Sequence, residues 1–92
     1  MNPRILSLPG VSIVIPTYNR RNDVLECLHS LRGLDYPNFE VMVVDNGSTD
    51  ETSDAIEKLF PEVKLVKSRR NLGVTGGRNL GANHSSYEYI LF

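Results

Sequence analysis

Residues 39–50 read FEVMVVDNGSTD, an apolar run that stops at an aspartate and passes into a polar turn. The run is rich in valine, and β-branched residues favour strands. Apolar residues at consecutive positions, rather than alternate ones, indicate a strand that is covered on both faces, as in a parallel sheet. Asn46-Gly47 directly after Asp45 is typical of a tight turn. We therefore predict a buried strand over residues 39–44 that ends at Asp45.

A second apolar run of the same kind lies nearer the N-terminus. Residues 11–15 read VSIVI, end at Pro16 and precede a polar turn over residues 18–22. A β-branched run closed by proline predicts another buried strand. Between the two strands, apolar residues recur at helical spacing over residues 23–32, with Asn22 as the expected N-cap.

The rest of the chain continues the alternation. Ser48 and Glu51 match the S-x-x-E capping box, which predicts a helix from about Thr49 to the residue before Pro61. A shorter and more polar strand is expected over residues 63–67, nearer an edge of the sheet. A glycine-containing helix over residues 74–83 and a fourth strand over residues 87–92 complete the pattern.

Strands that alternate with helices predict an α/β fold, because each parallel connection must cross over the sheet. We expect one Rossmann-like three-layer sandwich with a mostly parallel sheet over residues 11–92, preceded by a lead-in over residues 1–10. Hydrophobic residues make up 40% of the 92 residues, which is ordinary for a globular domain. The fourth strand reads YEYILF, and an apolar edge of this kind predicts self-association.

Composition narrows the function classes. The formal net charge of −1 argues against a strongly basic surface, so we expect no nucleic-acid partner. A single cysteine excludes an internal disulfide framework. The chain contains no apolar run of transmembrane length and does not open on a secretory signal, which predicts a cytoplasmic protein.

Ligands of parallel α/β sheets bind beyond the carboxyl ends of the strands, which directs attention to Tyr18 and Asp45. A tyrosine at this edge can stack on a nucleotide base, or it can simply cover the end of the sheet. A carboxylate only accepts hydrogen bonds, so Asp45 suits the ring N–H of uracil, thymine or guanine. It could equally well do no more than initiate the turn. We expect the two side chains to converge on one crevice.

Arg78 is a third candidate because it lies among several glycines, and a guanidinium suits a diphosphate or a base carbonyl. A surface ion pair is the simpler interpretation. The glycines match neither the dinucleotide-binding nor the P-loop pattern, although they allow close approach of the backbone to a ligand or a strand. Asp50 and Ser48 are interpreted as structural residues at the start of a helix.

Four stretches together resemble the start of the family 2 glycosyltransferases, which have the GT-A fold. They are VSIVIPTYNR at 11–20, FEVMVVDNGSTDET at 39–52, NLGVTGGRNLGA at 71–82 and YEYILF at 87–92. The third is similar to a subgroup that contains rhamnosyl- and other polysaccharide-building transferases. The resemblance implies a UDP-, dTDP- or GDP-sugar donor, and it implies that the donor site includes Pro16, Thr17, Tyr18, Asn19, Asp45 and Arg78. In that assignment Pro16 and Tyr18 line the base and ribose pocket, Asp45 accepts from the base N–H, and Arg78 approaches the base or diphosphate.

The resemblance also implies groups that these residues do not include. Family members hold Mn²⁺ or Mg²⁺ with a D-x-D motif that directly follows the fourth strand, and they use a carboxylate base for direct displacement at the anomeric carbon, commonly with inversion. The sequence reaches Phe92 before such a motif. We therefore expect neither metal ligands nor catalytic residues here, and we expect the chain alone to be inactive. The longer enzyme would transfer sugar to a glycan or lipid-linked acceptor, in the cytoplasm or at the inner face of the membrane.

Two other classes remain as alternatives. A sugar-nucleotide nucleotidyltransferase shares the nucleotide-binding topology, but it carries a glycine-rich basic loop after the first strand, and residues 16–22 contain no glycine. A non-catalytic nucleotide-binding α/β module is the other alternative. A signalling receiver domain of that kind needs acidic residues at the end of the first strand, where this chain has Pro16, Thr17 and Tyr18.

Overall fold

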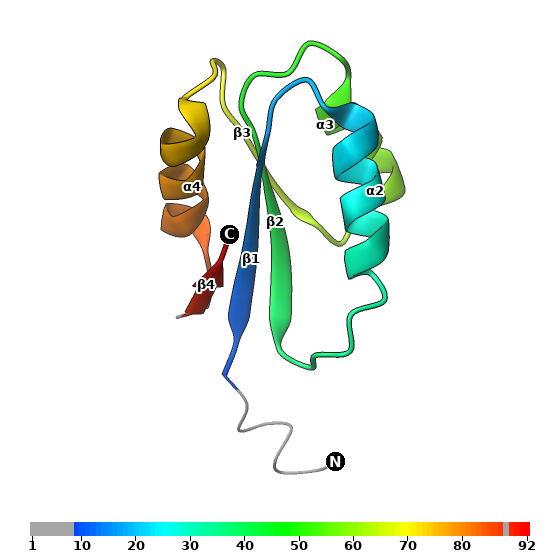
Figure 1. The fold of residues 1–92 in the computed structure, drawn as a ribbon, viewed down its shortest axis with the longest axis vertical. Coiled ribbons are helices and arrows are strands. Elements are labelled where there is room, and N and C mark those ends of the chain that lie inside the picture. The colour runs from blue at the N-terminus through cyan, green and yellow to red at the C-terminus, as the bar shows by residue number, and fades with distance from the viewer. Residues whose placement is uncertain (1–8, 88) are drawn as a thin grey trace.

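The computed structural model describes residues 9–87 and 89–92, in which strands and helices alternate along the chain (Figure 1). The predicted order of elements is confirmed. Most of the predicted lead-in, residues 1–8, lies outside the described residues. The elements are β1 (Val11–Thr17), α2 (Arg21–Leu31), β2 (Phe39–Asp45), α3 (Thr52–Leu59), β3 (Lys64–Lys67), α4 (Gly73–His84) and β4 (Tyr89–Leu91).

All neighbouring strands pair in parallel, in the order β3-β2-β1-β4. The chain adds β2 and then β3 on one side of β1, and α4 then carries it back to place β4 on the other side. Strand order therefore reverses between β1 and β4, which is where α/β folds form a ligand crevice. The pairing register sets Thr17 opposite Asp45, so both strands end at the same edge.

Helices cover both faces of the sheet, and this confirms the three-layer prediction. Figure 1 shows α2 and α3 on one side of the strands and α4 on the other. The core beneath α2 and α3 is apolar and consists of Val24, Leu28, Val43, Ile56 and Phe60. Within the part of the chain that the structure describes, no helix is long and apolar enough to cross a membrane.

The glycines of α4 let that helix lie directly against the sheet. A Cβ at Gly81 would come within 2.3 Å of Val14 Cγ1 and 3.0 Å of Val44 Cγ2. A Cβ at Gly77 would lie 3.1 Å from Pro16 Cβ. The close backbone approach that the glycines predicted is, at Gly77 and Gly81, an approach to strands β1 and β2.

The predicted helix starts are wrong by two or three residues. Helix α2 begins at Arg21, and Asn22 lies inside it instead of capping it. Helix α3 begins at Thr52, after Glu51 in the left-handed region at φ 63°. Ser48 and Glu51 form no capping box, because the Ser48 hydroxyl accepts the Asn19 N–H instead. The loops after β1 and β2 hold each other, and Asp50 accepts the Thr52 N–H at the start of α3.

Candidate functional site

Two loops that follow neighbouring strands form the edge where a ligand is expected. The first follows β1 from Tyr18, and the second follows β2 from Asn46. The Asn46 N–H continues the sheet pairing by donating to the Thr17 carbonyl at 2.8 Å. The two polar stretches that follow the buried strands thus begin side by side at the carboxyl ends of β1 and β2.

Asn19 joins these loops with its backbone and its side chain. Its N–H donates to Ser48 Oγ at 2.9 Å, and its Oδ1 accepts the Thr49 N–H at 2.7 Å. The residue has φ 50°, a left-handed conformation that asparagine tolerates better than most residues. The structure therefore places the predicted donor-site residue Asn19 in a contact that fixes one loop to the other.

Asp50 forms a second connection between the loops. Its Oδ2 accepts the Arg21 N–H at 3.1 Å, and its Oδ1 accepts the Thr52 N–H at 3.2 Å and the Thr52 hydroxyl. The hydrogen bond from the Thr52 hydroxyl, helped by those from the two backbone amides, lowers the pKa of the Asp50 carboxyl. Asp50 thus accepts backbone hydrogen bonds at the first residues of both α2 and α3. This confirms the interpretation of Asp50 as a structural residue.

Asp45 is buried, with 4% of its surface exposed, and its carboxylate is already engaged. Oδ1 accepts the Ser48 N–H at 2.9 Å, and Oδ2 accepts the Ser53 hydroxyl. Asp45 therefore does help to form the turn after β2, as one of the two interpretations predicted. A carboxylate has about four lone-pair sites, so these two bonds leave capacity for about two further donors. Asp45 borders a hollow of about 220 Å³ that also has Ser53 and Lys67 in its lining.

Tyr18 is 45% exposed and stands between two other hollows. A broad depression of about 660 Å³ runs from Tyr18 along the start of α2 to Asp50. A smaller hollow of about 150 Å³ separates the end of β1 from the start of α4 and is lined by Pro16, Thr17, Tyr18, Asn46, Asn71, Gly73 and Val74. We call the smaller one the Tyr18 hollow.

Convergence of Tyr18 and Asp45 on one crevice stays a prediction. Tyr18 and Asp45 share the same sheet edge, but Asp45 lines neither of the two hollows beside Tyr18. Tyr18 lies on the loop that leads to α2, whereas the Asp45 carboxylate bonds to Ser48 in the following loop and to Ser53 in α3. The Tyr18 hollow is the one that faces α4, on the side where strand order reverses.

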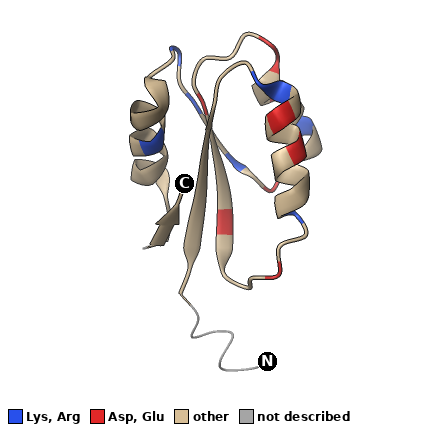
Figure 2. Cartoon of the chain, in the orientation of Figure 1, with Lys and Arg blue, Asp and Glu red and all other residues tan. Residues whose placement is uncertain are grey.

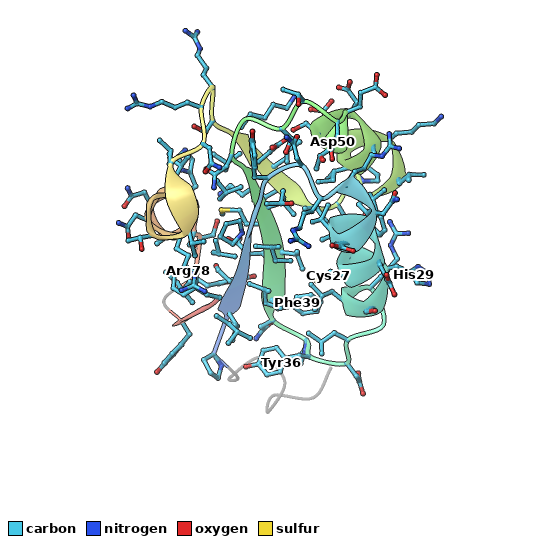
Figure 3. All side chains as sticks on the ribbon, turned by 45° about the horizontal axis from the view of Figure 1, so that its top comes forward. Cys27, His29, Tyr36, Phe39, Asp50 and Arg78 are labelled. Atoms are coloured by element: carbon cyan, nitrogen blue, oxygen red, sulfur yellow. The ribbon has the colours of Figure 1, made fainter. Side chains whose placement is uncertain are left out.

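Arg78 lies apart from both residues, on the exposed side of α4. Figure 3 shows it well separated from Asp50 and the loops at the strand ends. Its guanidinium lies over the Phe92 ring at 5.4 Å from the centroid, and none of the hollows at this edge includes it in its lining. Figure 2 shows Lys and Arg interspersed with Asp and Glu over α2, α3 and the loops, whereas Arg78 is the basic residue of α4.

The side chain of Asn46 has a role that its place in a predicted turn did not indicate. The structure buries the residue, with 3% exposed, and uses both ends of its carboxamide. Oδ1 accepts the Leu72 N–H at 3.4 Å, and Nδ2 donates to the Gly73 carbonyl at 3.3 Å. The adjacent glycine suggested a turn, and nothing in a single sequence indicates a bond to a segment 26 residues later.

Metal ligands were expected outside this chain. Among residues 9–87 and 89–92, no group of three or more His, Cys, Asp or Glu side chains could hold a metal ion. The location of the cation's ligands stays a prediction.

Comparison with known proteins relates this arrangement to a family. Residues 12–92 match the family described as glycosyl transferase family 2. A glycosyltransferase of Rickettsia bellii is 37% identical over the whole chain, and the poly-beta-1,6-N-acetyl-D-glucosamine synthase of Staphylococcus epidermidis is 32% identical over 89% of it. The mannosyltransferase PcManGT of Pyrobaculum calidifontis, solved with GDP-Man and Mn²⁺, superposes with a TM-score of 0.79 at 28% identity over 96% of the chain.

These proteins are much longer than the chain. It spans 14% of the Rickettsia protein, 20% of the Staphylococcus protein and 31% of the Pyrobaculum structure. The similarity therefore concerns one part of each relative.

Proposed function

Because the chain belongs to glycosyltransferase family 2, we propose that it is the nucleotide-sugar-binding part of a longer glycosyltransferase. The observation that carries the proposal is that the loops PTYN and DNGSTD stand together at the carboxyl ends of β1 and β2. Hydrogen bonds that involve Asn19 and the accepting carboxylate of Asp50 hold these segments to each other. An edge fixed in this way suits a ligand that needs a preformed site.

We assign the expected binding roles as follows. The exposed Tyr18 ring stacks on the base from the side of the Tyr18 hollow. Pro16 and Thr17 line that hollow. Asp45 uses its remaining acceptor capacity for a ring N–H of uracil, thymine or guanine. Asn19 keeps the Tyr18 loop in place, and Arg78 approaches the diphosphate from α4. The GDP-Man bound by the Pyrobaculum relative supports a nucleoside diphosphate sugar as the donor class.

Transfer itself requires groups that the described residues do not supply. A divalent cation would neutralise the departing diphosphate, and a carboxylate would take the proton from the acceptor hydroxyl. The Mn²⁺ in the Pyrobaculum structure supports the first expectation, and the Staphylococcus synthase supports a glycan as the product class. The proposal also includes a glycan or lipid-linked acceptor, an inverting outcome, and a location in the cytoplasm or at the inner face of the membrane.

A thermal-shift panel tests this function. We expect UDP, dTDP or GDP with Mn²⁺ to raise the unfolding temperature of the 92-residue chain more than ATP does, with no sugar transfer. A preference for ATP would favour a different nucleotide-binding module. Reaction of a sugar phosphate with a nucleoside triphosphate would indicate a nucleotidyltransferase. Measurable glycosyl transfer by the chain alone would contradict the expected inactivity.

Self-association through β4 is a further prediction. β4 is the terminal strand of the described sheet, and Tyr89 and Leu91 are more than half exposed. Such an edge offers unpaired backbone groups and apolar surface to a second chain. We expect light scattering to detect dimers or larger species of the isolated chain, and we expect Leu91→Lys to shift it toward monomer. Leu34→Lys, at an exposed leucine in a distant loop, should change little. A monodisperse wild-type monomer at high concentration would contradict the prediction.

A further inference from the structure

We propose that Asn46 is a positioning residue that sets the width of the Tyr18 hollow by fixing the start of α4 to the end of β2. This inference deepens the proposed nucleotide site and rests on that function for its effect on binding. The hydrogen-bonding geometry of Asn46 stands independently of any ligand.

The first step concerns the two bonds of the carboxamide. Oδ1 accepts the Leu72 N–H at 3.4 Å, and Nδ2 donates to the Gly73 carbonyl at 3.3 Å. Leu72 and Gly73 lie where the loop from β3 enters α4, so both bonds act on one short segment. A side chain that offers one donor and one acceptor is required to satisfy this pair, and asparagine supplies both.

The second step concerns the space around the carboxamide. A Cβ at Gly77, one turn into α4, would lie only 2.8 Å from Asn46 Nδ2. Gly73 has φ 76°, a conformation that favours glycine. Gly77 therefore makes room for the Asn46 carboxamide, and Gly73 supplies the carbonyl that this carboxamide binds.

The third step connects this contact to the site. Asn46 and Gly73 both line the Tyr18 hollow, opposite Pro16 and Tyr18. The distance between β1 and the first turn of α4 is the width of that hollow, and Asn46 is the side chain that bridges from the sheet to that turn. A shift of α4 away from the sheet would widen the hollow and weaken contacts to any base stacked on Tyr18.

The decisive variant is Asn46→Asp. The carboxylate keeps an acceptor for the Leu72 N–H but turns the Nδ2 donor into an acceptor that faces the Gly73 carbonyl. Asn46 bonds to Thr17, Leu72 and Gly73, and Gly77 packs against it. The adjoining titratable group is the Asp45 carboxylate, which accepts from Ser48 and Ser53. Protonation of the new carboxyl restores one donor and one acceptor. Burial raises the pKa of such a carboxyl, so the restoration occurs at a mildly acidic pH.

Two measurements on the 92-residue chain test the proposal. Amide hydrogen exchange at Leu72, measured by NMR, should lose about tenfold in protection in Asn46→Asp at pH 7.5, and the dissociation constant for UDP with Mg²⁺ should rise about tenfold. Both effects should diminish at pH 5. Asn83→Asp makes the same charge change at an exposed position at the far end of α4 and should alter neither quantity.

Gly77→Ala approaches the same carboxamide from the helix side without adding a charge. It should lower the protection of Leu72 at both pH values, with no recovery at pH 5. Unchanged protection in Asn46→Asp, or a loss that pH 5 does not reverse, would overturn the positioning role. If Leu72 responds as expected while the wild-type chain binds no UDP, GDP or dTDP, the positioning of α4 stands and the proposed nucleotide site fails.

Discussion

Gly81→Ala is expected to destabilise the chain severely, although alanine is the better helix former. The added methyl would lie 2.3 Å from Val14 Cγ1 and 3.0 Å from Val44 Cγ2, so α4 must move away from the sheet. Overpacking of this kind costs about 3 kcal/mol, and the gain in helix propensity returns about 1 kcal/mol. A net loss of about 2 kcal/mol lowers the unfolding temperature of a domain of this size by roughly 10 °C.

Gly33→Ala provides the matched control for this experiment. A Cβ there meets only the Ser30 carbonyl oxygen at 3.7 Å, an ordinary contact. Thermal unfolding followed by circular dichroism should therefore shift by much less than in Gly81→Ala. Equal melting temperatures of wild type and Gly81→Ala would show that α4 does not lie against Val14 in solution.

The architecture was predictable because its signals are local. Apolar runs that end in Pro16 and Asp45 mark the buried strands, and helical spacing marks the segments between them. The helix starts were not predictable, because they depend on contacts between segments that are distant in the sequence. Asp50 and Ser48 look like residues of one helix cap, yet Asp50 accepts from Arg21 at the start of α2, and Ser48 accepts from Asn19 in the loop after β1. These tertiary contacts add to the local bond between Asp50 and Thr52 at the start of α3, and spacing alone cannot reveal them.

The candidate site was predictable only to the level of a sheet edge. Parallel strands bring Tyr18 and Asp45 to that edge, but the direction of each side chain depends on the loop beyond it. Asp45 turns inward to Ser48 and Ser53, and Arg78 lies over Phe92 on α4. The carboxamide of Asn46 connects segments that are distant in the sequence, so its bridging role emerges only from the folded chain.

Asp45→Asn is expected to separate the turn-forming role of this residue from its proposed binding role. The amide oxygen can still accept the Ser48 N–H, and the amide nitrogen can donate to the Ser53 hydroxyl, so the fold should be retained. The charged acceptor for a base N–H is lost. A hydrogen bond to a charged group contributes about 1.5–3 kcal/mol, which corresponds to a dissociation constant for UDP about 10- to 100-fold higher.

The experiment compares UDP and ADP binding by titration calorimetry in wild type, Asp45→Asn and Asp35→Asn. Asp35 is exposed in a distant loop, so its variant makes the same charge change without touching the site. An unprotonated adenine has no ring N–H to donate, so the affinity for ADP should change little. The ratio of UDP affinity to ADP affinity should therefore fall in Asp45→Asn and stay the same in Asp35→Asn. An unaltered UDP affinity in a folded Asp45→Asn protein would mean that the carboxylate serves only the turn. Its hydrogen bonds with Ser48 and Ser53 would then be its whole role.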